Sequence, residues 1–374
     1  MKKIALLSFH NAANYGAALQ AYALQEALNQ LGYSCEYINY QNAHRRHAYS
    51  MTYHITESIK KGDFRSALLY FLGLPFMSLR KFRFRKFYGN FLKCTKKIYT
   101  SSEAALEMNG KYHKFIVGSD QVWNYENNGM DFAYLLDFVS APQDKISYSS
   151  SFGLCSIPDE LINKYKKYLN DIKFISVRES YGVKIVEDLI NKKAKLVLDP
   201  VFLLRKSDWN LLSHTINEKY VFSYTNRSQQ FSDFLFQTNF EIGKYKHYKL
   251  ARATSISDFI SKDIRVKYTM SPLEFISVIN NAELIVSASF HCVSLSIILN
   301  KPFVAILSGN KGKDERLLSI LHLLGLEDRI LSDSMSLHKV YEPIDYKAVN
   351  SKIDLLREDS LNFLINSINC DINI

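Results

Sequence analysis

His291 is the residue best suited to acid–base chemistry near neutral pH. It follows the apolar stretch 284–287 and stands at or just before an expected helix over residues 292–299. The unpaired backbone N–H groups and the dipole at such a helix start attract anions, and Ser287 and Ser289 add hydroxyl donors. A histidine in this setting can bind phosphate as a cation or exchange a proton. The alternative is a capping or buried structural histidine.

Cationic side chains at two other junctions are candidates for holding an anion. Arg178 lies at an expected strand end, where its guanidinium could grip a carboxylate or phosphate with two hydrogen bonds; the alternative is a surface pair with Glu179. Lys311, Lys313 and Arg316 lie near a further strand-to-helix junction, where a solvated helix start is the alternative. Together with His291, these junctions suit a small donor that carries two negative charges.

Two loops in the first half carry side chains suited to a sugar acceptor. In FIVGSDQVWN, residues 115–124, Asp120 is a candidate base or acceptor for a sugar hydroxyl, and an aromatic side chain could face the sugar ring. An Asp cap with a buried Trp is the alternative. In residues 10–19, Asn side chains can cap a helix, and a glycine permits close backbone approach. The acceptor-side candidates are Asn11, Asn14, Tyr15, Gly16, Ser119, Gln121, Trp123 and Asn124.

Neither a metal site nor a disulfide framework is expected. The five cysteines are scattered, odd in number and without a CxxC pair, which favours a reducing compartment. Cys292 has no base beside it in the sequence, so we expect it to be structural. The N-terminal MKKIALLSF has too short an apolar run for a signal peptide and reads as a buried strand. A cytoplasmic location follows as an expectation.

Alternating strands and helices must position these residues. Apolar stretches at 3–9 and 34–40 flank a helical pattern at 17–31, which predicts a βαβ unit with parallel strands. The alternation resumes after residue 114, and a second series starts near residue 220. We therefore predict an α/β protein with two Rossmann-like domains facing across a cleft. In such sheets, ligands bind beyond the carboxyl ends of the strands.

The 374 residues divide into two domains and a tail. Residues 1–198 form the expected acceptor-side domain, with a basic-aromatic helical insertion at about 44–100. Asp199-Pro200 marks the expected change to a donor-side domain over 199–345. Residues 346–374 form a helical tail, which we expect to pack back on the first domain.

The insertion holds most of the positive charge. Between residues 44 and 100 there are 13 Lys and Arg against two acids, in a chain of net charge +10. The segment could be a helical subdomain with solvated charges, an interfacial membrane segment, or a nucleic-acid surface. No recognised nucleic-acid-binding module accompanies the charge, so no nucleic-acid partner is expected. A membrane surface on the inner leaflet is expected to contact residues 64–97. The headgroup contacts would be Arg80, Lys81, Arg83, Arg85 and Lys86.

The ordered motifs resemble those of the polysaccharide pyruvyl transferase family. They are NAANYGAALQAYAL near the N-terminus, FIVGSDQVWN, ISYSSSFG, SVRES, LVLDPVFLL and SPLEFISVINNAELIVSASFHCVSLSIILNKPFVAI. The resemblance implies a two-domain fold similar to that of GT-B glycosyltransferases. It also implies transfer of a pyruvyl group from phosphoenolpyruvate to two hydroxyls of a sugar. The product would be a cyclic ketal on a cell-surface polysaccharide precursor, which we expect to be lipid-linked, and the only co-substrate would be phosphoenolpyruvate, with no further cofactor.

One departure from the family pattern concerns the donor. Many members carry Arg-Leu-His where this chain has Ser289, Phe290 and His291. The histidine carries over and the arginine does not, so a lysine or arginine of residues 311–316 would have to supply the missing charge. Two other functions stay open: a glycosyltransferase with the same architecture and a nucleotide-sugar donor, and a non-catalytic glycan-binding relative.

Overall fold

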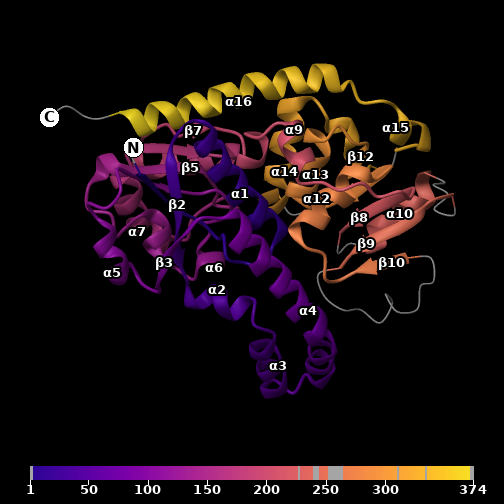
Figure 1. Ribbon diagram of the computed structural model, residues 1–374, viewed down its shortest axis with the longest axis horizontal. Helices are drawn as coiled ribbons and strands as arrows, with labels where there is room; N and C mark the ends of the chain where they lie inside the picture. Colours follow the sequence, from indigo (N-terminus) through magenta and orange to yellow (C-terminus); the bar gives the residue numbers. More distant parts are fainter. Residues whose placement is uncertain are drawn as a thin grey trace.

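The protein consists of two parallel β-sheets wrapped by helices (Figure 1). This computed structural model describes residues 3–225, 228–238, 244–251, 264–309, 311–332 and 335–370. All strand pairings are parallel within the described ranges. The predicted pair of Rossmann-like α/β domains is confirmed. The strands of the first sheet are β1 (Lys3–Leu7), β2 (Ser34–Tyr40), β3 (Cys94–Tyr99), β4 (Lys114–Val117), β5 (Lys145–Ser150), β6 (Phe174–Val177) and β7 (Lys195–Leu196).

The second sheet and the helices complete the two lobes. The strands of this sheet are β8 (Tyr220–Tyr224), β9 (Lys246–Leu250), β10 (Ile264–Lys267), β11 (Leu284–Ser287) and β12 (Phe303–Ala305). The helices are α1 (Tyr15–Gln30), α2 (Ala43–Ala48), α3 (Met51–Lys60), α4 (Phe64–Phe91), α5 (Ser102–Ala105), α6 (Tyr125–Asn128), α7 (Asp159–Asp171), α8 (Ser180–Ile190), α9 (Lys206–Leu211), α10 (Ser228–Thr238), α12 (Pro272–Asn281), α13 (Phe290–Ile298), α14 (Lys311–Leu324), α15 (Leu337–Tyr341) and α16 (Tyr346–Asn369).

The order of strands locates the loops that can bind a ligand. The first sheet runs β3-β2-β1-β4-β5-β6-β7, so the direction of winding reverses between β1 and β4. The second sheet runs β10-β9-β8-β11-β12 and reverses between β8 and β11. At such a reversal, the loops leaving neighbouring strands diverge and open a crevice beyond the carboxyl ends. The β1 and β4 loops of one lobe, and the β8 and β11 loops of the other, are therefore the expected ligand-binding loops.

The start of α1 brings these two reversal points together. The Asn14 side chain caps the helix by accepting from Ala17 N at 3.2 Å. The Tyr15 ring, 1% exposed, stacks on Phe275 of the second lobe at 4.6 Å between ring centres. Its hydroxyl donates to Met270 O at 2.6 Å. The first turn of α1 is thus fixed between the lobes by an aromatic stack and a hydrogen bond.

Helix α4 also ties the lobes together, through two of its arginines. Arg80 is buried, and its guanidinium is 3.5 Å from both Ala13 O in the first lobe and Ala251 O in the second. Arg83 donates to both carboxylate oxygens of Glu274, at 2.7 and 3.0 Å. The expectation that Arg80 contacts lipid headgroups is wrong, because its side chain is buried between the lobes. Arg83 is 35% exposed and pairs with Glu274.

The predicted helical insertion also includes a strand. Residues 94–99 form β3, which pairs with β2 at the edge of the first sheet. Lys96 and Lys97 are exposed on it, as charged residues on edge strands commonly are because they discourage further strand pairing. Part of the charge assigned to the insertion therefore belongs to the sheet.

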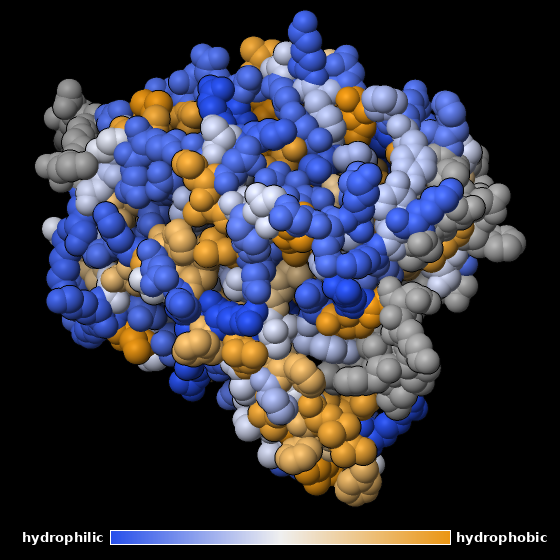
Figure 2. Space-filling model, turned by 45° about the vertical axis from the view of Figure 1, so that its right-hand side comes forward, coloured by the Kyte–Doolittle hydropathy of each residue, from blue (hydrophilic) through white to orange (hydrophobic). Residues whose placement is uncertain are grey.

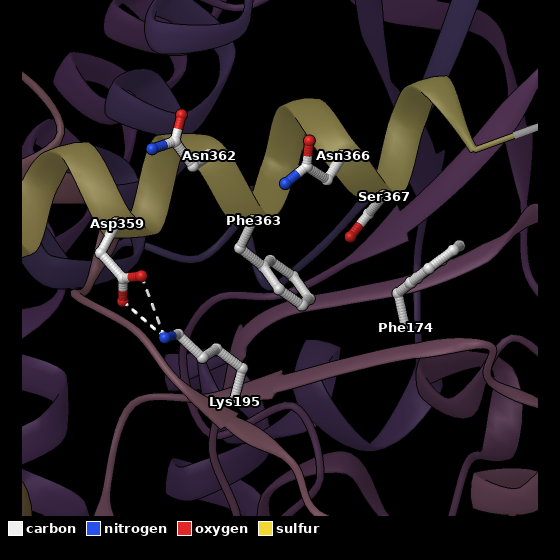
Figure 3. Close-up of a pocket in the computed structure, with 7 residues that line it drawn as sticks. All are labelled: Phe174, Lys195, Asp359, Asn362, Phe363, Asn366 and Ser367. Atoms are coloured by element: carbon white, nitrogen blue, oxygen red, sulfur yellow. Dashed lines mark hydrogen bonds and ion pairs between the residues drawn. The ribbon is translucent and has the colours of Figure 1, made fainter.

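Helix α16 spans the outside of both lobes (Figure 1). Near its start the Tyr346 hydroxyl donates to Lys301 O at 2.5 Å, and near its middle the Ser360 hydroxyl accepts from Leu198 N at 3.0 Å. A cavity of about 260 Å³ lies between α16 and strands β6 and β7 (Figure 3). Its ionisable lining residues are Lys195 and Asp359, which pair with each other at 2.8 Å. With no further acid or base to converge on a ligand, this cavity offers no catalytic arrangement.

Candidate functional site

Arg178 is the centre of a buried charged cluster at the carboxyl ends of the strands. It follows β6 directly, and its side chain is 1% exposed. Nη1 donates to Asp199 Oδ2 at 2.7 Å, and Nη2 donates to Asp120 Oδ1 at 3.4 Å. Nε is 3.7 Å from Glu179 Oε2. Burial alone would lower the pKa of Arg178, but the three carboxylates outweigh it and raise the pKa.

The two aspartates of the cluster are ionised at neutral pH. Burial favours the neutral form of Asp120, yet the charges of Arg178 and His291 outweigh this and lower its pKa. The pKa of Asp199 is also lowered, because interactions with His291 and Arg178 outweigh the cost of burial. Asp120 is 15% exposed and Asp199 is fully buried. Asp120 is therefore the carboxylate that a ligand can reach.

The pKa of the third carboxyl group, Glu179, is shifted in the opposite direction to those of the two aspartates. Burial raises its pKa, and the charges of Arg178 and Arg316 offset that effect only in part. Its Oε1 accepts from Phe152 N at 3.0 Å and from Gly153 N at 3.4 Å. The alternative of a surface Arg–Glu pair is wrong, because both side chains are almost completely buried.

His291 reaches this cluster from the second lobe. It lies in the first turn of α13, its side chain is 9% exposed, and its Nε2 is 3.5 Å from Asp199 Oδ2. Nε2 has no hydrogen-bond partner among the residues that the structure describes. A Cβ atom added to Gly16 would overlap the Nδ1 side of the imidazole. The ring is thus held between the linker residue Asp199 and the start of α1.

Substituting Gly16 by alanine is expected to displace the imidazole. Overpacking of this kind costs about 1–3 kcal/mol, so G16A should lower the free energy of unfolding. If His291 is the acid–base group that the sequence predicts, turnover should also fall at least about tenfold, because the imidazole moves. Urea denaturation and steady-state kinetics measure both. Gly89→Ala is the matched control, since Gly89 is an exposed helical glycine with no neighbouring atom within 4 Å of the added Cβ. Equal turnover in the two variants would contradict the close packing.

Arg316 is a second cation of the cluster, and like Arg178 it has a buried Nε without a hydrogen-bond partner within the described part of the chain. Burial, and then repulsion by Arg178, lowers the pKa of Arg316 to about 10. The ring of Phe290 lies near both guanidinium groups, 5.3 Å from that of Arg178 and 5.9 Å from that of Arg316. An anion placed beside Arg316 would relieve this repulsion and supply the missing acceptor.

The serines that precede α13 differ in what they offer. The Ser287 hydroxyl is buried and donates to Tyr224 O at 2.8 Å, which ties β11 to β8. Ser289 occupies the N-cap position but its hydroxyl makes no capping bond to the helix. Ser289 is therefore the better placed of the two for a ligand. The side chains of Lys311 and Lys313, the other donor-side candidates, lie outside the described part of the structure.

A comparison with known families identifies the chain. The family model described as polysaccharide pyruvyl transferase matches residues 14–310, most of the chain. The chain belongs to the polysaccharide pyruvyl transferase family. It is therefore a transferase of polysaccharide biosynthesis. No curated protein sequence matches it significantly.

Solved structures similar to this pyruvyl transferase family member have low sequence identity to it. A UDP-GlcNAc 2-epimerase from Methanocaldococcus jannaschii has a TM-score of 0.49 at 12% identity, covering 98% of this chain and 99% of that chain. The Neisseria meningitidis UDP-GlcNAc 2-epimerase has 0.49 at 7%, covering 99% and 100%. The glycosyltransferase SnogD from Streptomyces nogalater has 0.43 at 12%, covering 96% and 95%. At sequence identities this low, the similarity describes the fold and says nothing about the activity of this chain.

Several acceptor-side candidates of this family member are occupied in packing. Trp123 is fully buried and its indole donates to Tyr134 O at 2.9 Å, so the expected stacking of a sugar on this ring is wrong. Ser119 is buried too, with its hydroxyl 3.1 Å from Asp199 Oδ2. Asn124 caps α6. The alternative prediction, that Trp123 is a buried structural residue, is confirmed.

The remaining acceptor-side candidates are tied to backbone or to each other. The Asn11 side chain donates to Tyr40 O at 3.0 Å. Asn14 caps helix α1, and the Tyr15 ring stacks on Phe275. Gln121 Oε1 accepts from the Asn127 amide at 2.9 Å. Gly16 contributes the close approach to His291, rather than to a ligand. Asp120 is thus the residue of these loops whose side chain both belongs to the charged cluster and is partly exposed.

Sequence reasoning missed two acids and one arginine of the site. The sequence predicts Asp199 only as the start of the second domain, although an acid inside the apolar run LVLDPVFLL is itself a signal that it has a buried partner. Glu179 was considered only as a surface partner. Arg45, from the insertion, lies 3.5 Å above the Phe9 ring centre, and its charge helps to lower the pKa of Asp120; no sequence signal separates it from the other basic residues.

The described residues offer no obvious metal site. Within the described ranges, no three His, Cys, Asp or Glu side chains are grouped as metal ligands would be. Cys292 is buried, and burial raises the pKa of its thiol to about 12. It is therefore a thiol at neutral pH, as a structural cysteine would be.

Proposed function

We propose that this transferase moves a pyruvyl group from phosphoenolpyruvate to two hydroxyls of one sugar in a polysaccharide precursor, forming a cyclic ketal. The observation that supports this most is the position of His291, which reaches the carboxylate–arginine cluster of the other lobe. The site then combines a proton donor, an arginine with unused donors and a partly exposed carboxylate. These are the groups that such a transfer needs, and the family assignment supports the same reaction class.

The donor would bind between the start of α13 and Arg316. Phosphoenolpyruvate carries a carboxylate and a phosphate, and both favour arginine and helix N-termini. Arg316 replaces the charge that many members carry at the position of Ser289, whose hydroxyl adds a donor. Arg178 contributes its charge at short range, although Nη1 and Nη2 already donate to Asp199 and Asp120. Lys311 and Lys313 stay donor-side proposals.

In the proposed reaction, His291 protonates the methylene carbon of phosphoenolpyruvate, which is an enol phosphate. The neighbouring carbon becomes cationic and bonds to the oxygen of the first sugar hydroxyl, whose proton passes to the imidazole of His291, which is neutral after its first transfer. The second hydroxyl then displaces phosphate from the same carbon and closes the ring, and its proton leaves with the phosphate. Asp120 accepts a hydrogen bond from a sugar hydroxyl; its lowered pKa favours this role over that of a strong base.

The acceptor is proposed to be lipid-linked, and the enzyme to work in the cytoplasm at the inner membrane face. Such an acceptor keeps its sugar at the bilayer surface while its lipid stays in the membrane. The enzyme would reach it as a peripheral protein. Across the described helices, none is both long and apolar enough to cross a bilayer.

Mass spectrometry tests the reaction directly. A candidate glycan incubated with the enzyme and phosphoenolpyruvate should gain the mass of one pyruvate less one water, with release of one phosphate. An unchanged glycan across a panel of bacterial cell-surface sugars, with no phosphate released, would count against the reaction. The same panel without phosphoenolpyruvate is the control.

Because Ser289 stands where many family members have an arginine, two other functions need to be tested: a nucleotide-sugar glycosyltransferase and a non-catalytic glycan-binding protein. A nucleotide-sugar glycosyltransferase should be stabilised by nucleoside diphosphates, and a non-catalytic glycan-binding relative by glycan alone. Our proposal predicts an increase in melting temperature with phosphoenolpyruvate, because a ligand that binds only the folded state stabilises it. Thermal-shift measurements with the three ligands separate the functions.

A further inference from the structure

Helices α3 and α4 form a hairpin that projects from the body of the molecule (Figure 1). One face of α4 carries large apolar side chains that contact solvent. Their spacing of one, three, four and seven residues along the chain places them on a single stripe. The exposed fractions are 69% for Phe64, 58% for Leu68, 62% for Phe71, 55% for Leu72, 44% for Leu79 and 63% for Phe82.

This stripe differs from the rest of the surface. The facing helix α3 adds Ile59, which is 50% exposed, so the apolar area extends across the tip of the hairpin. Figure 2 shows it as a continuous hydrophobic region over the lower projection. Elsewhere on the described chain, exposed large apolar side chains are scattered over separate elements, such as Leu106, Leu211 and Leu355. A contiguous apolar area of this kind marks an interaction surface.

Exposed cations flank the stripe. Lys60, Lys61 and Arg65 lie at the tip, and Lys81, Arg85 and Lys86 lie further along α4. The two acids of the hairpin are Glu57, which pairs with Lys60 at 2.9 Å, and Asp63, which caps α4. An apolar stripe bordered by cations matches an anionic phospholipid surface, where phosphates meet acyl chains. A second copy of the hairpin would instead bring like charges together.

We propose that the α3–α4 hairpin docks on an anionic phospholipid bilayer, with the α4 stripe inserted at the boundary between headgroups and acyl chains. Lys81, Arg85 and Lys86 then contact lipid phosphates, whereas Arg80 and Arg83 stay in the interface between the lobes. The proposal goes beyond the transfer reaction, because it assigns membrane contact to a defined element and stands whether or not pyruvyl transfer is correct. It also explains why so much apolar surface is left uncovered.

Vesicle flotation tests the stripe. The protein should float with vesicles of phosphatidylglycerol and phosphatidylcholine at low salt, but not with phosphatidylcholine alone. The triple variant L68S/F71S/L72S should lose at least roughly tenfold in binding, because apolar burial drives insertion. The matched control is L106S/L211S/L355S, which removes three apolar side chains that are also more than half exposed but lie on other elements, and it should bind as the wild type does.

Charge neutralisation tests the flanking cations. K81Q/R85Q/K86Q should weaken binding by roughly 100-fold, since each cation near an anionic surface contributes on the order of a fivefold gain in affinity. K166Q/K167Q/K193Q removes three exposed lysines that lie on α7 and in the α8–β7 loop, outside the hairpin, and should have little effect. Added salt should weaken wild-type binding.

Circular dichroism and melting temperature check that the variants are folded, which is expected because all substituted side chains are exposed. No flotation of the wild type at low salt, or equal flotation of the stripe variant, would overturn the proposal. A wild-type dimer that the stripe variant loses, without vesicle binding, would assign the stripe to a second copy instead. The readout needs no sugar or phosphoenolpyruvate, so a failure of the proposed reaction does not change it.

Discussion

Replacing His291 by alanine is expected to lower the turnover of pyruvyl transfer by about 100- to 10,000-fold, which is the usual contribution of general acid–base catalysis. Among the described residues, the imidazole nitrogen Nε2 makes no hydrogen bond and has a single ion-pair partner, Asp199, at 3.5 Å. The ring therefore carries little of the fold, and the protein should stay folded without it. Phosphate release during a single turnover measures the loss, and circular dichroism measures the fold.

A matched buried histidine separates the role of His291 from a general effect of losing a ring. His247 is 1% exposed, lies 2.7 Å from the Ser223 hydroxyl, and packs against Phe231. Burial lowers the pKa of His247 to about 4, so it is neutral at pH 7. His247→Ala should lower the melting temperature while changing turnover little. Near-normal turnover in H291A would remove His291 from the mechanism.

The sequence predicted the central elements of the fold well because their local signals are strong. Helix α12 and strand β11 show this, and β11 has the bounds of the apolar stretch at 284–287. The former has Ser271 and Glu274 as a reciprocal capping box and Pro272 in its first turn. Strands β3 and β10 were missed as strands. Both lie at sheet edges and each contains two charged residues, so they lack the apolar run that marks a central parallel strand.

From the sequence, we could predict which residues of the site follow the ends of strands, but not which of them contact one another. His291, Arg178 and Asp120 were found because each follows a strand whose end meets the same region. Which of them touch was not predictable, because the contacts join residues 58 positions apart, as for Arg178 and Asp120, through the packing of separate strands. The prediction that a sugar stacks on Trp123 was wrong for the same reason. The sequence shows that a tryptophan is present, but only the packing of the fold decides that its ring faces the core.

The insertion shows the same limit at the level of a helix face. Its composition correctly marked α4 as basic and aromatic, yet Arg80 is buried while Lys81 is exposed next to it. Consecutive residues on a helix point about 100° apart, so adjacent cations have different environments. Telling the arginines that join the lobes from the exposed cations of α4 therefore needed the packing of α4 against Glu274 and Tyr15.

Breaking the Arg178–Asp199 pair is expected to destabilise the protein by about 3–5 kcal/mol, because either substitution leaves a charge buried without its partner. Nη1 donates to Asp199 Oδ2 at 2.7 Å, and both side chains are inaccessible to solvent. Arg178→Met and Asp199→Asn should each lower the free energy of unfolding in urea by this amount. The double variant should lose less than the sum of the two, since the second substitution removes a charge that the first has left unpaired. A double-mutant cycle gives this coupling.

The Arg83–Glu274 pair is the matched control. It also joins two elements by an arginine and a carboxylate at 2.7 Å, but its side chains are 35% and 41% exposed. Solvent screens such a pair, so Arg83→Met should change the free energy of unfolding by no more than about 1 kcal/mol. Similar losses for R83M and R178M would show that burial of the cluster does not set its strength.

The pH dependence of stability gives an independent check on the same pair. The pKa of Asp199 in the folded protein lies below its ordinary value, so its ionised form stabilises the fold at neutral pH. That contribution is present above the unfolded pKa, about 4, and is lost as the pH falls through the lower, folded-state pKa. Wild-type stability should therefore decline below about pH 4 more steeply than that of D199N, which has no carboxylate to protonate there. Parallel declines in the two proteins would mean that Asp199 does not carry the ionised charge on which the Arg178 pair depends.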